Sequence, residues 1–141
     1  MTIAAFTDNA RFLSNFYPSP IEYDEITYPT LEHAYQAAKC RDEHKNVKVY
    51  IARLRTPAMA KRRGREIEMR PDWDHIKLGV MEELVRIKFS TEPLRGMLKA
   101  TAGHDLIEGN TWGDTFWGVC RGKGHNHLGK ILMKIRDEIN H

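Results

Sequence analysis

The spacing of apolar residues predicts a mainly helical chain. After Thr30, apolar side chains recur at helical intervals, at Leu31, Ala34, Tyr35 and Ala38. Thr30 is a residue type that caps helix starts, and the ten residues that follow Pro29 contain no Pro or Gly. We therefore expect a helix that begins after Thr30 and turns one apolar face toward a core.

Five further helices are predicted from capping residues, prolines and apolar spacing. They run from about His44 to Leu54, from Thr56-Pro57 to Gly64, from after Asp72 to about Phe89, from Thr91-Glu92-Pro93 to before Gly103, and from about Asn126 onward. The buried stripe of the long third one is predicted as Trp73, Ile76, Val80, Leu84 and Ile87. That of the last helix is predicted as Leu128, Ile131, Leu132, Ile135 and Ile139.

Extended segments are fewer. Ile21–Tyr23 and Ile26–Tyr28 flank Asp24-Glu25 in a hairpin pattern, although Glu25 occupies a turn position where Gly would be easiest. Other short extended pieces are expected before the last helix. The predicted fold is therefore mainly α: a single compact helical domain over residues 1–141, an orthogonal bundle, with a small N-terminal β-hairpin and short extended segments.

Composition restricts the expected partners and compartment of the protein but does not indicate its function. The 141 residues are 41% hydrophobic and carry a net charge of +3, which is too mild to require a nucleic-acid partner but suits an anionic small molecule. No long apolar run or leader pattern is present, so we expect a cytoplasmic protein without a membrane partner. Cys40 and Cys120 are too few for a disulfide framework and are predicted to be free thiols.

A polar stripe on the first predicted helix contains the side chains best suited to catalysis. Glu32, Gln36 and Lys39 fall at positions i, i+4 and i+7, so a carboxylate, an amide and an amine can share one pocket wall. Glu32 also lies in the first turn, where the helix dipole favours its ionised form. The alternative is a capped surface helix with an ordinary polar face.

A second cluster lies between Gly109 and Gly129. Glycines at 118, 122 and 124 would let the backbone approach a ligand, while Arg121 and Lys123 precede a helix start suited to phosphate. The alternative is a flexible loop whose charges are only solvated.

Three other residues of this cluster have two interpretations each. Asp114 could supply a second carboxylate. Trp112 and Trp117 could stack on a base, although a place in the core is the favoured role for either.

Two further features are less specific. The basic run Lys61–Arg65 ends a predicted helix, where the dipole favours cations; a nucleic-acid patch and a phosphate-facing arginine are the other interpretations. The histidines show no metal-ligand spacing, so we expect no metal and no cofactor.

Several motifs follow one another along the chain: Phe12-Leu-Ser-Asn-Phe-Tyr-Pro18, Tyr28-Pro-Thr-x-Glu-His-Ala-Tyr-Gln-Ala-x-Lys39, Asp72-Trp73, Lys88-Phe89, Asp114-x-x-Trp-Gly118 and Gly122-Lys-Gly-x-Asn-x-Leu-Gly129. Taken in order, they resemble the NAD- and ADP-ribose-associated (NADAR, or YbiA-like) family. The resemblance extends from about Phe6 to Arg136. It implies a mostly helical fold and an N-glycosidase that cuts ribosyl C–N bonds. Members are associated with phosphorylated ribosylamino-pyrimidine intermediates of riboflavin synthesis, and others with removing ADP-ribose from guanine.

The resemblance implies a site at Glu32, Lys39, Trp73 and Asp114, with Trp117 and Asn126 nearby. Glu32, Lys39 and Asp114 are the expected catalytic residues. The expected substrate contacts are Ser14, Asn15, Tyr35, Gln36, Trp73, Trp117, Gly118, Arg121, Lys123 and Asn126.

These residue types suit cleavage of a ribosyl C–N bond, which places positive charge on the sugar. Glu32 could stabilise that charge or activate water, and Lys39 could pair with Glu32, hold a phosphate or hydroxyl, or attack the sugar as a Schiff-base nucleophile. Trp73 would form an aromatic wall, and Asp114 would hold ribose hydroxyls or help protonate the departing base. The expected partner is a phosphorylated ribosyl compound or an ADP-ribosylated guanine, free or within nucleic acid. Two alternatives are a non-catalytic module that binds ADP-ribose or an NAD derivative, and a nucleic-acid-binding module.

Overall fold

The computed structural model describes all 141 residues and divides the chain into two compact units. The central unit is Asn15–Lys88, and the terminal unit combines Met1–Ser14 with Phe89–His141. Helices make up 47% of the chain, and the remaining regular structure is three two-stranded sheets, so the prediction of a mainly α fold with small sheets is confirmed. One domain over residues 1–141 and an orthogonal bundle both concern the arrangement of the whole chain, and they stay predictions.

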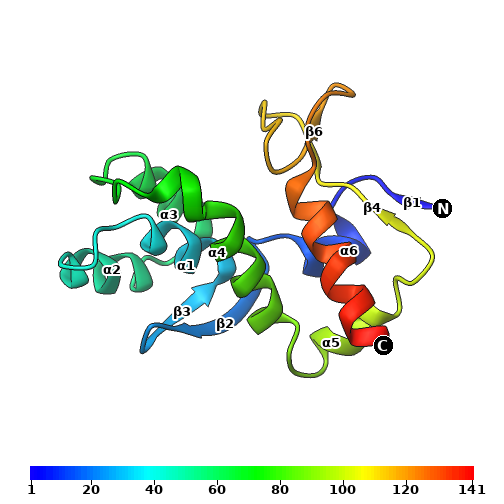
Figure 1. Ribbon diagram of the computed structural model, residues 1–141, viewed down its shortest axis with the longest axis horizontal. Helices are drawn as coiled ribbons and strands as arrows, with labels where there is room; N and C mark the ends of the chain where they lie inside the picture. The colour runs from blue at the N-terminus through cyan, green and yellow to red at the C-terminus, as the bar shows by residue number, and fades with distance from the viewer. The chain divides into compact units, whose positions relative to one another are not determined.

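The central unit consists of one hairpin and four helices (Figure 1). In chain order these are β2 (Pro18–Tyr23), β3 (Ile26–Thr30), α1 (Leu31–Ala38), α2 (Lys45–Ala52), α3 (Pro57–Gly64) and α4 (Trp73–Lys88). Helix α1 contacts α2, α3, α4 and both strands, so it is the element around which this unit is assembled.

The hairpin forms where it was predicted. Strands β2 and β3 are antiparallel, with Tyr23 opposite Ile26 and Ile21 opposite Tyr28. Asp24 and Glu25 at the turn have φ angles of 51° and 69°, the left-handed conformation that the twist of a two-residue hairpin turn requires. Because Ile21 and Tyr28 are buried, one face of the hairpin belongs to the core.

Helix α1 begins as predicted, but it is not the surface helix of one interpretation of the sequence. The Thr30 hydroxyl accepts a hydrogen bond from the backbone N–H of His33, which confirms the cap. All eight residues of the helix are buried, including Glu32 and Gln36, which are 8% and 3% exposed. The interpretation as a surface helix with a solvated polar face is therefore wrong, because neighbours enclose this helix on every side.

The stripe predicted for α4 is correct only in part. Trp73, Val80 and Leu84 are buried, whereas Ile76 and Ile87 are half-buried. The remaining buried positions of the helix are Met81, Val85 and Lys88. The buried face is rotated because α4 packs against both α1 and β2, and a single-stripe pattern assumes one neighbour.

The terminal unit contains the remaining elements (Figure 1). They are β1 (Thr2–Ile3), the 3₁₀ helix η1 (Asp8–Leu13), α5 (Leu94–Lys99), β4 (Asp105–Leu106), β5 (Gly109–Asn110), β6 (Val119–Cys120) and α6 (His127–Asn140). Strand β1 pairs in parallel with β4, and β5 pairs in parallel with β6. The N-terminal strand and its pairing with residues 105–106 were not predicted.

The core of this unit is built on α6. Four of the five predicted stripe positions are buried, and Ile139, near the frayed end of the helix, is half-buried. Arg136 is also buried, and its Nη1 donates to the Thr101 carbonyl at 2.9 Å and to the His104 carbonyl at 2.8 Å. This guanidinium ties α6 to the turn after α5, because burying a cation requires acceptors of this kind.

Two expectations about the whole chain can be compared with the structure. Cys40 and Cys120 are free and buried, as predicted, and burial raises the pKa of the Cys40 thiol. None of the helices combines the length and the apolar character needed to cross a bilayer.

A buried histidine links the start of α1 to the end of α2. The Nε2 atom of His33 lies 2.9 Å from the Leu54 carbonyl, and Nδ1 lies 2.7 Å from the Thr30 hydroxyl. Because a carbonyl can only accept, Nε2 carries a proton. Burial lowers the pKa of the ring below the ordinary value of 6.5, so near pH 7 the ring is neutral and Nδ1 accepts from the Thr30 hydroxyl.

This depressed pKa predicts a loss of stability in mild acid. Below about pH 6.5 the unfolded chain takes up a proton that folded His33 resists, so the free energy of unfolding falls until the pH reaches the folded pKa. Urea unfolding between pH 7.5 and pH 5 would measure this slope. His33→Gln should reduce the slope, whereas the exposed His75→Gln should leave it unchanged. An identical slope in all three proteins would contradict the prediction.

Candidate active site

The carboxylate of Glu32 is held within the central unit. The backbone N–H of Glu32 donates to the Asn15 carbonyl at 3.1 Å, and Gln36 Nε2 donates to Glu32 Oε2 at 2.5 Å. Glu32 lies in the first turn of α1, where the dipole favours a negative charge by roughly 0.3–1 kcal/mol. The helix therefore fixes one of the two carboxylate oxygens and supports the ionised form.

Lys39 follows one helical turn after Gln36, at the C-terminal cap of α1. Burial lowers the pKa of its amine; the Glu32 charge acts in the opposite direction, and the charges of Arg65, Lys61 and Lys77 lower the pKa further. The neutral, nucleophilic form of this amine is therefore more accessible than in an exposed lysine. This arrangement brings together the acid–amine stripe that the sequence predicted.

Two aromatic rings support this stripe. The Tyr35 and Trp73 ring centroids are 5.3 Å apart, and Lys39 Nζ lies 5.3 Å from the centre of the Tyr35 ring. Both rings are buried, with exposed fractions of 6% and 5%. Little of either ring is exposed, and the aromatic wall expected of Trp73 stays a prediction.

The two residues before the hairpin have different surroundings. Asn15 is buried, and its side-chain Nδ2 lies 3.6 Å from the Met81 sulfur, so its carbonyl is well placed to hold the start of α1. Ser14 belongs to the terminal unit, where it caps η1 by donating its backbone N–H to Arg11 at 2.9 Å.

In the terminal unit, Asp114 organises a loop. Its Oδ1 accepts from the backbone N–H groups of Phe116 and Trp117, at 3.1 and 2.9 Å. Asn110, which sequence reasoning did not select, accepts from the N–H of Asp114 and donates to the carbonyls of Asp114 and Val119. One oxygen of the Asp114 carboxylate thus holds the turn, as short Asx side chains often do. The only sequence signal for the role of Asn110 is that Asn is frequent in turns.

The glycines of this loop serve the chain itself. A Cβ at Gly118 would lie 2.1 Å from the Glu108 carbonyl oxygen, and one at Gly124 would lie 2.1 Å from the Gly118 carbonyl oxygen. These two glycines let neighbouring segments of the same loop pass closely. The close approach to a ligand expected at glycines 118, 122 and 124 stays a prediction.

Asn126 has its side-chain amide occupied in the same way. Its Oδ1 accepts from the Glu108 N–H at 3.0 Å, and its Nδ2 donates to the Leu106 carbonyl at 2.9 Å. Residue 126 is buried and adopts a left-handed backbone at the start of α6. This side chain therefore ties the loop to the helix, and a direct contact with substrate stays a prediction.

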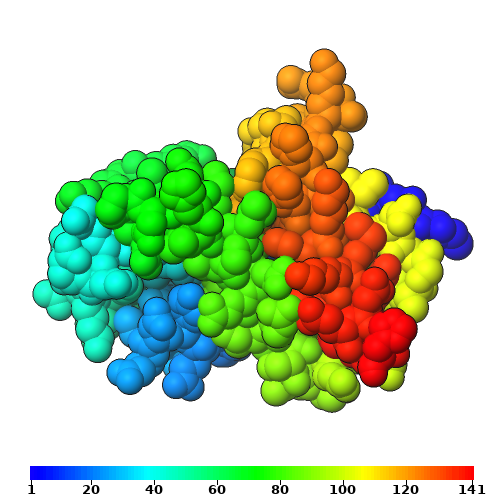
Figure 2. Space-filling model, in the orientation of Figure 1, coloured from blue at the N-terminus to red at the C-terminus, as the bar shows by residue number.

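The exposed side chains of this loop are the ones that a ligand can reach. Arg121 and Lys123 lie on the turn after β6, which projects from the rest of the terminal unit (Figure 2). Trp117 is half-buried against Phe116, with ring centroids 4.8 Å apart. Trp112 is 62% exposed, so the favoured core position is wrong for this tryptophan.

The candidate residues thus fall into two groups. Glu32, Tyr35, Gln36, Lys39 and Trp73 lie together around α1, with Asn15 at its start. The others belong to the terminal unit: Ser14, Asp114, Trp117, Gly118, Arg121, Lys123 and Asn126. The acid and amine required for glycosidic chemistry are both in the first group.

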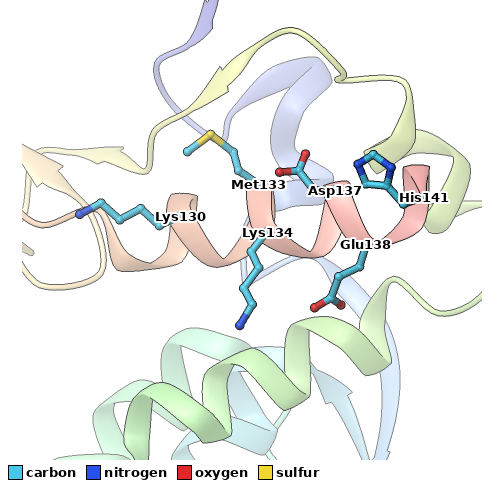
Figure 3. Close-up of a pocket in the computed structure, with 6 residues that line it drawn as sticks. All are labelled: Lys130, Met133, Lys134, Asp137, Glu138 and His141. Atoms are coloured by element: carbon cyan, nitrogen blue, oxygen red, sulfur yellow. The ribbon is translucent and has the colours of Figure 1, made fainter.

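No group of three or more His, Cys, Asp or Glu residues is placed to hold a metal ion. A hollow on the terminal unit is lined by side chains of α6 and the C-terminal residue (Figure 3): Lys130, Met133, Lys134, Asp137, Glu138 and His141. It mixes both signs of charge and contains no predicted site residue.

Gly64 supplies a sharp test of the Glu32–Gln36 arrangement. A Cβ at Gly64 would lie 1.8 Å from Gln36 Oε1, so Gly64→Ala should displace the amide that holds Glu32. We expect a loss of about 1–3 kcal/mol in the free energy of unfolding and reduced turnover. Gly79→Ala is the matched control, because nothing lies within 4 Å of its added Cβ and alanine favours a helix by roughly 1 kcal/mol. Similar behaviour of the two variants in denaturation and activity assays would contradict the arrangement.

Comparison with known proteins agrees with the resemblance. N-glycosidase YbiA of Escherichia coli is 39% identical over 137 residues, which cover 94% of this chain and 84% of that protein. The riboflavin biosynthesis protein VVA0006 of Vibrio vulnificus is 40% identical over 136 residues, but these are only 36% of that longer protein. The NMR structure of Escherichia coli YbiA aligns with a TM-score of 0.85 at 36% identity, covering 99% of this chain and 84% of that chain.

The family relationship extends over almost the whole sequence. The NADAR domain matches residues 4–140, which include every residue of the stripe on α1 and of the loop before α6. This match, together with the curated relatives and the solved structure, establishes that the chain belongs to the NADAR domain family.

Proposed function

We propose that this protein hydrolyses the C–N bond between a phosphorylated ribose and a base. That it is a hydrolase of N-glycosyl bonds follows from its curated relatives, which are named N-glycosidases. Our proposal adds the identity of the substrate, which is a phosphoribosylamino-pyrimidine of riboflavin synthesis or an ADP-ribosylated guanine. The first is favoured by relatives named riboflavin biosynthesis proteins in maize and Vibrio vulnificus.

The observation that carries this proposal is that Glu32 and Lys39 lie on one stripe of the buried helix α1, where the charge of Glu32 acts on the Lys39 amine. Departure of the base leaves positive charge on the anomeric carbon and the ring oxygen of ribose. A carboxylate in a buried site stabilises that charge more strongly than one in water, since less solvent screens the interaction. Gln36 keeps the Glu32 carboxylate oriented by a direct hydrogen bond, so little reorganisation is needed when the charge develops.

The ribosyl C–N bond can be cleaved by either of two routes. In the first, Glu32 removes a proton from water, whose oxygen bonds to the anomeric carbon as the base leaves with its electron pair and is protonated. In the second, the neutral amine of Lys39 attacks that carbon, the base departs, and the sugar ring opens to an imine that water then hydrolyses. The lowered pKa of Lys39 supports the second route. Asp114 stays a predicted contact of the ribose hydroxyls.

The proposal is tested by incubating the purified protein with both substrate classes and identifying the products by mass spectrometry. Release of the free base and of the phosphorylated sugar from at least one class is the expected result. Binding without release would point instead to a module that recognises ADP-ribose or an NAD derivative.

Glu32→Gln should nearly abolish turnover while leaving the fold intact. The amide has almost the same shape but lacks the charge that stabilises the cationic transition state, and loss of such an interaction typically costs a hundredfold to a thousandfold in kcat. Steady-state kinetics and circular dichroism provide the two measurements. Activity within a few-fold of the parent in a folded variant would remove Glu32 from the mechanism.

Lys39→Ala should also lose most activity, because either route uses the amine, as nucleophile or as the countercharge of Glu32. Borohydride separates the two roles. A reduced sugar adduct on Lys39 during turnover would establish the imine route, whereas full turnover without an adduct would favour direct attack by water. Lys45→Ala, an exposed lysine at the start of α2, is the control and should keep the parent activity.

A further inference from the structure

The last turn of α3 lies alongside the catalytic stripe of α1. Gly64 approaches Gln36 so closely that no Cβ fits between them. Lys61 and Arg65 lie three residues before and one residue after this contact, on the same side of the helix. The two cations therefore flank the point at which α3 touches the residue that holds Glu32.

The position of Lys61 is fixed by a second contact. Its Nζ lies 6.0 Å from the centre of the Phe16 ring. Phe16 follows Asn15, whose carbonyl accepts the backbone N–H of Glu32. The amine of Lys61 is thus near the Glu32 end of the stripe, while Arg65 follows the Gln36 contact.

Helix α4 adds another cation from the opposite direction. Lys77 is one helical turn after Trp73, whose ring packs against Tyr35, and Lys39 lies over the Tyr35 ring. Lys77 is paired with Asp74 at 3.4 Å, in a contact at the surface of α4. Lys61, Arg65 and Lys77, from two helices, therefore lie close enough to α1 for their charges to act on Lys39.

The charges in this region are not balanced. Arg65, Lys61 and Lys77 all disfavour the charged form of Lys39, and Glu32 is the carboxylate that opposes them. Arg65 is exposed and forms none of the ion pairs of this unit. Like charges gathered in this way raise one another's energy, and an anion placed among them lowers it.

We infer that Lys61, Arg65 and Lys77 form an anion subsite that holds the phosphate of the ribosyl substrate beside Glu32 and Lys39. The inference rests on the function proposed above and adds the residues that select a phosphorylated sugar. A phosphate matches this set because it carries up to two negative charges and accepts paired hydrogen bonds from a guanidinium.

The helix dipole alone does not account for this arrangement. It favours every cation in the last turn of α3, including Arg62 and Arg63. Arg63, however, pairs with Glu66 at 2.9 Å and lies over the Tyr50 ring, and Arg62 is not among the cations that act on Lys39. Lys61 and Arg65 are the members of the basic run that face the stripe.

The test compares binding of ribose 5-phosphate, inorganic phosphate and ribose to the full chain by titration calorimetry. Lys61→Ala and Arg65→Ala should each weaken ribose 5-phosphate binding by roughly tenfold or more, the cost of losing a charged hydrogen bond. Weak binding of ribose should not change. Arg62→Ala is the matched control and should bind ribose 5-phosphate as the parent does. Arg65→Lys should fall between the parent and Arg65→Ala, because it keeps the charge but not the paired geometry.

Several outcomes would overturn the subsite. If Lys61→Ala and Arg65→Ala match Arg62→Ala, the cluster does not bind phosphate. If instead Arg121→Ala and Lys123→Ala abolish the preference, phosphate is recognised by the turn after β6. Binding does not depend on turnover, so the two proposals fail separately. Phosphate recognition lost in Arg65→Ala, with no hydrolysis of any ribosyl substrate by the parent, would support the subsite and refute the N-glycosidase substrate.

Discussion

The complete burial of α1 is the constraint on which the central unit depends. A helix enclosed on all sides normally has apolar side chains throughout, yet this one includes Glu32, His33 and Gln36. Such polar groups are stabilised by partners within the protein. The hairpin supplies Thr30, the end of α2 supplies the Leu54 carbonyl, and Gln36 Nε2 donates to Glu32, although Gln36 Oε1 has no hydrogen-bond partner. The contact with Gln36 that makes the burial of Glu32 tolerable also fixes the position of its carboxylate.

The sequence predicts the secondary structure of this unit well because the signals are local. Thr30 and Thr56 both cap the helices that they precede, and the hairpin turn forms at Asp24-Glu25 without glycine. The number of neighbours around a helix is not a local property. For that reason the buried face of α4 was misplaced, and the polar stripe of α1 had a surface interpretation that the structure excludes.

The candidate site was predictable to a similar extent. The spacing of Glu32, Gln36 and Lys39 indicated a shared stripe, and the resemblance marked it as a site. Contacts between distant residues could not be predicted in this way. The Asn126 amide binds backbone groups 18 and 20 residues away, and Gly64 meets Gln36 across 28 positions, so neither role follows from spacing within one helix. Nor does a basic run at a helix end reveal which of its cations face a neighbouring helix.

The loop before α6 has a consequence for how this enzyme could diversify. Its course is set by Asn110, Asp114 and Asn126 and by two glycines that pack against backbone, while the side chains of Trp112, Arg121 and Lys123 point into solvent. The residues that set the course of the loop and the residues exposed on its surface are therefore separate sets. Mutations in the exposed set can accumulate without changing the path of the chain, so the chemistry of this surface can vary among relatives while the fold is preserved.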